Sequence, residues 1–236
     1  MKYQYILFDL YGTLCDIMTD ENMPFVWRVT ADNYAKFGAV YTPEELKKSF
    51  YRTVNEQIED KDSDFEPDLA ITFKKLFLDK NVQVSDDVIL QIGQEFRKSS
   101  TLFLNLYDGV IDGLKALKAE GKKIILMSNA QRIFTYPELE ILNLVDLFDD
   151  IFISSDYGVK KPSLKFYDLP FKKYGINKEN AIMVGNDGTC DILGAKTYGI
   201  DTMYVRTNTS PKEEYPPATY IFSSHNFKVM TKILMI

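Results

Sequence analysis

The chain has 236 residues, 45% of them hydrophobic, which suffices for one domain with an insertion or for two small domains whose cores need no disulfide. Its 34 acidic and 28 basic residues give a net charge of −6, which disfavours nucleic acid and anionic membranes as partners. The two cysteines lack metal-ligand spacing, the N-terminus lacks a signal-peptide pattern, and no long apolar run is present. We therefore expect a cytoplasmic protein. We also expect it to be a monomer or a homodimer.

The first predicted element is a strand over Tyr5–Phe8, and a loop that begins with Asp9 follows it directly. In open α/β sheets ligands bind beyond the carboxyl ends of the strands, so this position presents the Asp9 carboxylate to a ligand. Gly12 permits a backbone conformation that a side chain would forbid, and the Thr13 hydroxyl can hydrogen-bond the loop or the carboxylate. We predict that Asp9 is a nucleophile, while an ordinary strand-ending turn explains this segment by itself about equally well.

Residues 16–104 are polar and helical in period, and no strand is predicted among them. Four helices are expected, at residues 22–37, 42–58, 68–80 and 86–99. The second opens with Thr42-Pro43-Glu44-Glu45, a capping box with proline at the first helical position. Four consecutive helices predict a bundle that is inserted, as a cap domain, between the first strand and the rest of the chain.

From residue 108 onward, helices and strands alternate. Strands are predicted at residues 123–127, 150–154, 181–184 and 202–205, each after a helix, with a further edge strand at 220–222 and a closing helix or apolar tail at 227–236. Gly121, Gly175 and Gly199 end three of these helices. The pattern predicts an α/β fold with a doubly wound parallel-sheet (Rossmann-like) core of residues 1–15 and 105–236 and a helical-bundle cap domain of residues 16–104.

Polar residues follow four of the predicted strands, and parallel strands end on one rim of a sheet. The residues expected to meet there are Asp9, Thr13, Ser128, Asn129, Lys160, Lys161, Asn186, Asp187 and Asp191. Ordinary alternatives exist for the separate segments. Ser128 and Asn129 are typical of a helix cap, Lys161 of a solvated surface, and Asp187 and Asp191 of a helix N-terminus.

Four segments resemble, in order, the motifs of the haloacid dehalogenase-like hydrolase superfamily: Phe8–Leu14, Ser128-Asn129, Lys161-Pro162 and Val184–Ala195. The resemblance covers the whole chain, and residues 16–104 match the helical cap of that family. It implies that Asp9 is a covalent nucleophile, that Ser128 and Lys161 hold the anionic part of the substrate, and that the last acidic motif holds Mg²⁺. A carboxylate nucleophile divides one displacement into two steps, the second of which is hydrolysis of the intermediate.

One departure from the family's phosphatases favours a dehalogenase. Those phosphatases carry a second Asp two residues after the nucleophile, which protonates the leaving alkoxide, whereas this chain has Tyr11, as the dehalogenases do. A halide leaves without a proton. Tyr167 also matches a tyrosine of the dehalogenases, and Arg28 in the cap could bind a substrate carboxylate, although a packing role and a surface ion pair are the ordinary alternatives.

A second departure favours a phosphatase, because dehalogenases work without metal and have a serine-rich fourth motif, whereas Asp187 and Asp191 are acidic. Carboxylates about 4 Å apart repel by roughly 4 kcal/mol at an effective dielectric of 20, so such a site favours a cation. The predicted ligands of Mg²⁺ are Asp9, the Tyr11 backbone carbonyl and Asp187 or Asn186. The expected substrate is a small anion, either a 2-haloacid or a phosphate monoester, and the alternative is a non-catalytic relative that binds a phosphorylated ligand.

Overall fold

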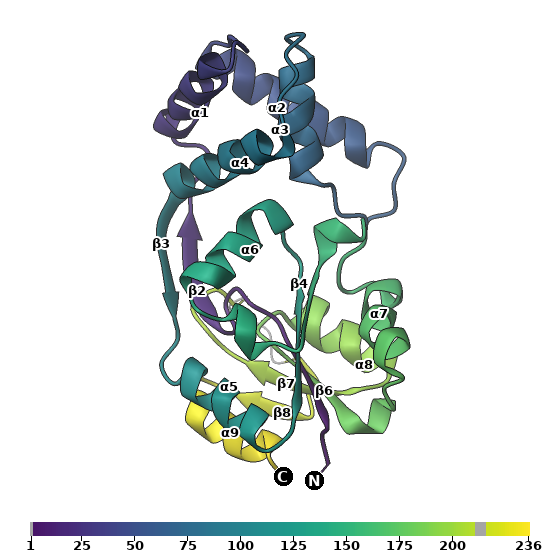
Figure 1. The fold of residues 1–236 in the computed structure, drawn as a ribbon. Helices are drawn as coiled ribbons and strands as arrows, with labels where there is room; N and C mark the ends of the chain where they lie inside the picture. Colours follow the sequence, from purple (N-terminus) through teal and green to yellow (C-terminus); the bar gives the residue numbers. More distant parts are fainter. Residues whose placement is uncertain (1, 211–215) are drawn as a thin grey trace.

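The computed structural model describes residues 2–210 and 216–236 and shows an α/β core with a helical cap at one end (Figure 1). A six-stranded sheet runs through the core in the order β5-β4-β1-β6-β7-β8, and every neighbouring pair is parallel. Its strands are β1 (Tyr5–Phe8), β4 (Lys123–Ser128), β5 (Asp150–Ile153), β6 (Ala181–Gly185), β7 (Asp201–Val205) and β8 (Tyr220–Phe222). The predicted parallel sheet is therefore confirmed.

Helices cover both faces of this sheet, because successive residues of a buried strand point to opposite sides. The core helices are α5 (Val110–Ala119), α6 (Arg132–Ile141), α7 (Leu164–Tyr174), α8 (Gly194–Tyr198) and α9 (Phe227–Leu234). Ile6 and Phe8 of β1 pack in one apolar cluster with residues of α5, α6 and α9. Leu7 packs on the other side with residues of α7 and α8, so the predicted doubly wound arrangement is confirmed as well.

The cap consists of α1 (Pro24–Lys36), α2 (Pro43–Ile58), α3 (Leu69–Leu78) and α4 (Asp86–Ser100), at the positions expected from the sequence. The predicted capping box opens α2, where the backbone N–H of Glu45 donates to the Thr42 hydroxyl over 3.1 Å. The apolar core of the cap also includes Ile133 and Phe134 of α6. Since α6 lies between the cap and the sheet in Figure 1, this helix joins the two parts.

The prediction that residues 16–104 contain no strand was wrong. Strand β2 (Cys15–Thr19) pairs antiparallel with β3 (Thr101–Leu106), and the two-stranded ribbon connects the core to the cap. Each strand is short and its residues pair with partners 82 to 91 positions away, from Thr19 with Thr101 to Cys15 with Leu106, so no local pattern marks either of them. The domain boundaries that we predict from the sequence stay a prediction.

A close contact in the cap gives a test of how the cap packs on α6. A Cβ atom on Gly93 of α4 would lie 2.4 Å from the Ile133 Cδ1 atom. We expect Gly93→Ala to lower the free energy of unfolding by about 1–3 kcal/mol, because the added methyl group overpacks this contact. Ile133→Ala removes the clashing atoms, so the double variant should be more stable than the two separate losses imply. Urea unfolding measures this, and strictly additive losses would contradict the contact.

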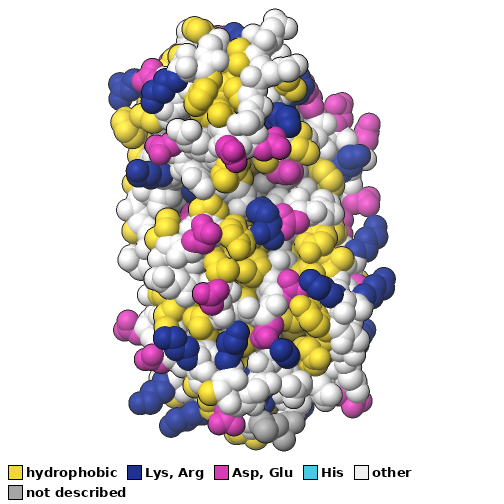
Figure 2. Space-filling model, in the orientation of Figure 1, with side chains coloured by type: hydrophobic (Ala, Val, Ile, Leu, Met, Phe, Trp, Pro, Cys, Tyr) yellow, Lys and Arg dark blue, Asp and Glu magenta, His cyan; other side chains and the backbone are white. Residues whose placement is uncertain are grey.

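No helix in residues 2–210 and 216–236 has the length and apolar character needed to cross a membrane. On the face shown in Figure 2, lysines and arginines are interspersed with acidic residues over both cap and core. This face therefore lacks the extended basic surface that binds nucleic acid.

Candidate active site

A cavity of about 240 Å³ lies at the carboxyl ends of three neighbouring strands, β4, β1 and β6. The residues that line it are Asp9, Tyr11, Gly12, Ser128, Asn129, Lys161, Asn186, Asp187, Cys190, Asp191 and Thr209. Most of them come from the loops that directly follow these strands. The structure thus brings together the residues that the sequence pattern expects at one rim, except Thr13 and Lys160, which do not line this cavity.

Lys161 is the central cation of this cavity. Its Nζ atom donates to Asp9 Oδ1 over 2.8 Å, to Asp191 Oδ1 over 2.7 Å and to the Met127 carbonyl over 2.7 Å. The side chain is almost completely buried. Burial opposes its charge, but the ion pairs with Asp191 and Asp9 outweigh that cost and raise the pKa of Lys161. The lysine therefore stays charged beside Asp9, and the alternative of a solvated lysine was wrong.

Asn129 holds the lysine segment in place. Its Nδ2 donates to the Lys161 carbonyl over 2.9 Å, and the Lys161 N–H donates to Asn129 Oδ1 over 2.8 Å. The peptide bond between Lys161 and Pro162 is cis. Since both ends of the amide bind the chain itself, Asn129 positions Lys161; it also lines the cavity, and a contact with the substrate stays a prediction.

Ser128 lines the cavity and is buried. Within the part of the chain that the structure describes, its hydroxyl has no recorded hydrogen bond, so it can donate to a bound anion. The helix-cap alternative was wrong, because α6 begins after Gln131.

The loop after β1 has the geometry that its sequence suggests. Gly12 has φ of +81°, and a Cβ atom there would lie 2.4 Å from the Asn186 amide nitrogen. A glycine is required at this position on both grounds. The Thr13 hydroxyl lies 3.2 Å from Asp9 Oδ2 and 3.2 Å from Asn186 Oδ1, so it links the nucleophile loop to the loop after β6.

Asp187 and Asp191 have different surroundings. Asp187 Oδ1 accepts the backbone N–H groups of Thr189 and Cys190 over 2.8 and 2.6 Å. It thereby caps a π-helical turn (Gly188–Leu193) that precedes α8, where the sequence predicted one continuous helix. The helix-capping alternative for Asp187 is thus confirmed, and its carboxylate still lines the cavity.

Asp191 is fully buried and binds Lys161. Its other oxygen, Oδ2, accepts the Asp187 N–H over 3.0 Å. Burial raises the pKa of the Asp191 carboxyl, and the charge of Lys161 opposes that rise. A Cβ on Gly185 would lie 2.2 Å from Asp191 Oδ2, so this approach requires glycine. Asp191 therefore acts as a support for Lys161.

The donor atoms of the cavity fit Mg²⁺ in kind. In residues 2–210 and 216–236, no group of three acidic, histidine or cysteine side chains is arranged to hold a metal. Asp9, Asp187 and Asn186 nevertheless present carboxylate and amide groups to one cavity. Mg²⁺ in phosphate-binding sites commonly takes one or two carboxylates and keeps several waters, so two carboxylates suit it.

Tyr11 takes part in a buried group that the sequence analysis missed. Its hydroxyl donates to Glu138 Oε2 and lies 2.9 Å from Thr135 Oγ1, and both partners belong to α6. Arg97 of the cap donates through Nε to Glu138 Oε1 over 2.7 Å. We call Tyr11, Thr135, Glu138 and Arg97 the Tyr11 cluster. The sequence does contain an indication of this cluster. Glu138 follows Phe134 by four residues, which places a glutamate on the buried face of an amphipathic helix.

Arg28 and Tyr167 do not reach the cavity. Arg28 is exposed on α1, with its guanidinium 5.7 Å from the Phe25 ring centre. Tyr167 is buried on α7, and its hydroxyl donates to the Cys190 carbonyl over 2.6 Å. Neither residue therefore lines the cavity, and Tyr167 supports the turn that carries Asp187.

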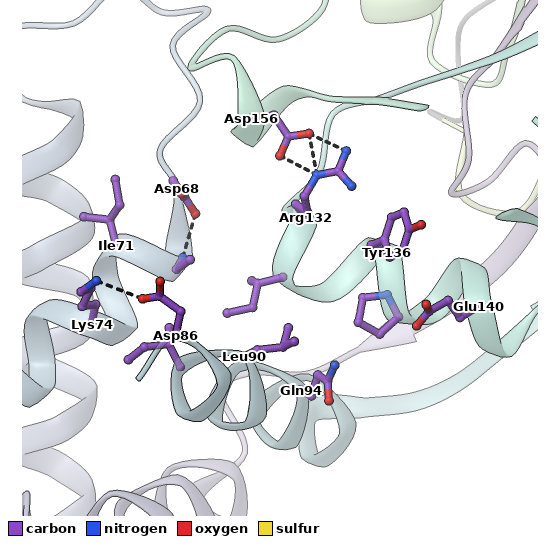
Figure 3. A pocket seen from close by; sticks show the side chains of 14 residues that line it. Asp68, Ile71, Lys74, Asp86, Leu90, Gln94, Arg132, Tyr136, Glu140 and Asp156 are labelled. Carbon is purple, nitrogen blue, oxygen red and sulfur yellow. Dashed lines mark hydrogen bonds and ion pairs between the residues drawn. The ribbon is translucent and has the colours of Figure 1, made fainter. Parts of the chain in front are cut away.

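A larger cavity of about 640 Å³ lies between the cap and α6 (Figure 3). The two cations among its described lining residues are already paired, Arg132 with Asp156 and Lys74 with Asp86. Both pairs are open to solvent, with Asp86 88% and Arg132 41% exposed, whereas Lys161 and Asp9 are 1% and 11% exposed. The chemistry is therefore assigned to the smaller cavity.

Comparisons with known proteins agree with this geometry. A family model described as haloacid dehalogenase-like hydrolase matches residues 3–199. A glyceraldehyde 3-phosphate phosphatase of Pyrococcus furiosus is 28% identical, over 87% of this chain and 81% of that protein. A 2-haloacid dehalogenase structure from Pseudomonas syringae pv. Tomato DC3000 has a TM-score of 0.66 at 18% identity, over 98% of both chains. A magnesium-bound structure of the putative HAD-hydrolase YfnB from Bacillus subtilis has a TM-score of 0.58 at 19% identity, over 100% of both.

Proposed function

The chain belongs to the haloacid dehalogenase-like hydrolase family, and from that premise we propose that it hydrolyses a small phosphate monoester through a covalent intermediate on Asp9, with Mg²⁺ bound. The observation that carries this proposal is the pairing of Asp9 with the buried Lys161 in a cavity that also contains the Asp187 carboxylate. The lysine keeps an anionic nucleophile in place, and the second carboxylate suits a divalent cation.

In the first step, an Asp9 carboxylate oxygen attacks phosphorus, and the bond between phosphorus and the leaving oxygen breaks. In the second, water attacks the phosphorus of the aspartyl phosphate, which releases phosphate and regenerates Asp9. The Ser128 hydroxyl donates to a phosphoryl oxygen, and Lys161 offsets the negative charge that develops there. Mg²⁺, held by Asp9 and Asp187 with Asn186 or the Tyr11 carbonyl, would neutralise part of the phosphate charge.

The charges of the cavity favour a phosphate ester over a 2-haloacid. A haloacid carries a carboxylate that needs a cationic or hydrogen-bonding partner. Lys161 is the one cation among the described lining residues, and its three hydrogens are already donated to Asp9, Asp191 and Met127, so it acts on a bound anion through its charge alone. A phosphate would gain a further cationic partner in the Mg²⁺ that Asp9 and Asp187 suit, whereas a haloacid bound without metal would have none. Arg28 lies elsewhere. The phosphatase named among the relatives of this chain adds support for the same choice.

The direct test is a pair of assays on the purified protein. We expect p-nitrophenyl phosphate to be hydrolysed with Mg²⁺ and the activity to disappear with EDTA, whereas 2-chloropropionate should release no chloride. Asp187→Asn should raise the Mg²⁺ concentration for half-maximal activity at least about tenfold, because it removes a charged ligand. Asp112→Asn, an exposed site on α5, is the matched control. Chloride release that needs no metal would identify a dehalogenase instead.

A further inference from the structure

The Tyr11 cluster lies where the cap, α6 and the nucleophile loop meet. Glu138 is 6% exposed and Thr135 is fully buried, while Arg97 reaches them from α4. The Arg97 guanidinium also lies 5.7 Å from the centre of the Tyr11 ring. Burying two charges is costly unless they are paired, so Arg97 and Glu138 must stay together. The pair therefore holds Tyr11 and Thr135 in place. Nothing in the proposed chemistry uses Arg97 or Glu138 directly.

Hydrogen-bond accounting fixes the direction of the Tyr11 hydroxyl. An ionised carboxylate only accepts hydrogen bonds, so the single hydroxyl proton of Tyr11 is donated to Glu138. Thr135 must then donate to the Tyr11 oxygen across their 2.9 Å contact. The tyrosine thus lines the cavity, but its proton is directed into the cluster.

The charge of Arg97 makes this arrangement durable. An arginine side chain keeps its charge in proteins, and the Arg97 Nε atom donates to Glu138 Oε1 over 2.7 Å. Glu138 therefore keeps a cationic partner and remains an acceptor. Tyr11 lines the cavity two residues after the nucleophile Asp9. Its hydroxyl proton is already donated to Glu138, so it has none to give to a leaving group.

We propose that Arg97 and Glu138 are positioning residues which turn the Tyr11 hydroxyl away from the cavity, so that the enzyme favours phosphate compounds whose leaving group departs as a stable anion. Aryl and acyl phosphates belong to this class, whereas alkyl phosphates do not. When the phosphorus–oxygen bond breaks, the electron pair stays on the leaving oxygen, so the leaving group departs as an anion and needs no proton from the enzyme. This inference rests on the proposed phosphatase function.

The first experiment compares kcat/KM for p-nitrophenyl phosphate, acetyl phosphate and glycerol 3-phosphate at one Mg²⁺ concentration. A positioned general acid typically contributes about 10²–10⁴-fold, so glycerol 3-phosphate should be at least about 100-fold slower than the other two. Comparable rates for all three would overturn the inference and leave the phosphatase intact. No hydrolysis of any of them, with chloride released from 2-chloropropionate, would remove the proposed function itself.

Variants of Tyr11 separate this effect from the intrinsic reactivity of the substrates. Tyr11→Asp places a carboxyl group where a leaving oxygen could be protonated, so the ratio of alkyl to aryl rates should rise at least about tenfold. Tyr11→Phe keeps the ring and should change both rates by the same factor. A selective loss of glycerol 3-phosphate hydrolysis in Tyr11→Phe would mean that the tyrosine is the acid, and the proposal would then be wrong.

The positioning role is tested by removing both charges together, because Glu138 alone would remain buried without its cation and Arg97 alone would keep only its longer, 3.9 Å pair with Glu21. In Arg97→Met/Glu138→Leu/Thr135→Val the Tyr11 hydroxyl loses both acceptors within reach, because the Thr135 oxygen could otherwise take the place of Glu138, and it can then donate into the cavity. We expect the ratio of alkyl to aryl rates to rise threefold or more, and Tyr11→Phe added to this variant should cancel the rise. A ratio that stays within twofold of the parent value would contradict the role assigned to Arg97 and Glu138.

Discussion

Replacing Asp9 by asparagine is expected to lower kcat for p-nitrophenyl phosphate by roughly 10³-fold or more, the scale of loss seen when a nucleophile is removed. The amide has nearly the shape of the carboxylate, so the cavity should keep its form. It lacks the negative charge needed to attack phosphorus. Lys161 retains Asp191 and the Met127 carbonyl as partners, so the variant should still fold.

Steady-state turnover measures the loss, and mass spectrometry of acid-quenched protein measures the intermediate. Wild-type protein should yield a phosphorylated peptide that contains Asp9, whereas Asp9→Asn should yield none. The matched control is Asp32→Asn, the same change at an exposed position of α1, which should leave both readouts unaltered. A variant that keeps a tenth of the wild-type turnover would exclude covalent catalysis at Asp9.

Lys161→Met is expected to have the largest effect on stability. It leaves Asp9 and Asp191 without their shared cation inside a buried site. Loss of one partner from a buried ion pair typically costs about 3–5 kcal/mol, and we expect the free energy of unfolding to fall by that amount. Activity should disappear together with the cation beside the nucleophile.

A second substitution separates these two consequences. In Lys161→Met/Asp191→Asn the fully buried carboxylate loses its charge, so the double variant should regain part of the stability but no activity. Urea unfolding and phosphate release give the two measurements. Lys172→Met, at a side chain that is 79% exposed, is the control and should change stability by less than about 1 kcal/mol. A fall of similar size in the control would contradict the importance of the Lys161 site.

Asp9 and Lys161 together explain how the cavity can contain several carboxylates, although like charges repel. Asp9 and Asp191 share one lysine, whereas the Asp187 carboxylate is held by backbone N–H groups. From the sequence, Asp9, Asp187 and Asp191 were expected to repel one another as a single group. The structure instead gives Asp191 a supporting role, so Asp9 and Asp187 are the acids that we propose as metal ligands.

Local patterns in the sequence determined the sheet, its helices and the residues after each strand. Short apolar runs that alternate with helical segments mark β1, β4, β6 and β7. A parallel topology then brings Asp9, Ser128, Lys161 and Asp187 to one rim. Gly12 and the capping box at Thr42 were predictable for the same reason, because backbone conformation at such positions depends on the nearest few residues.

Only the tertiary structure decided which partners these side chains have. Three contacts join segments that are distant in sequence: β2 pairs with β3, Asn129 binds Lys161, and Tyr11 meets Glu138 and Arg97. The position of Arg28 outside the cavity also depends on how the cap folds. A polar side chain contributes according to the donors and acceptors that burial brings within reach, and residue type alone does not specify them. For this reason the sequence determined where the site lies, and the packing of the cap and α6 decided what its tyrosine can do.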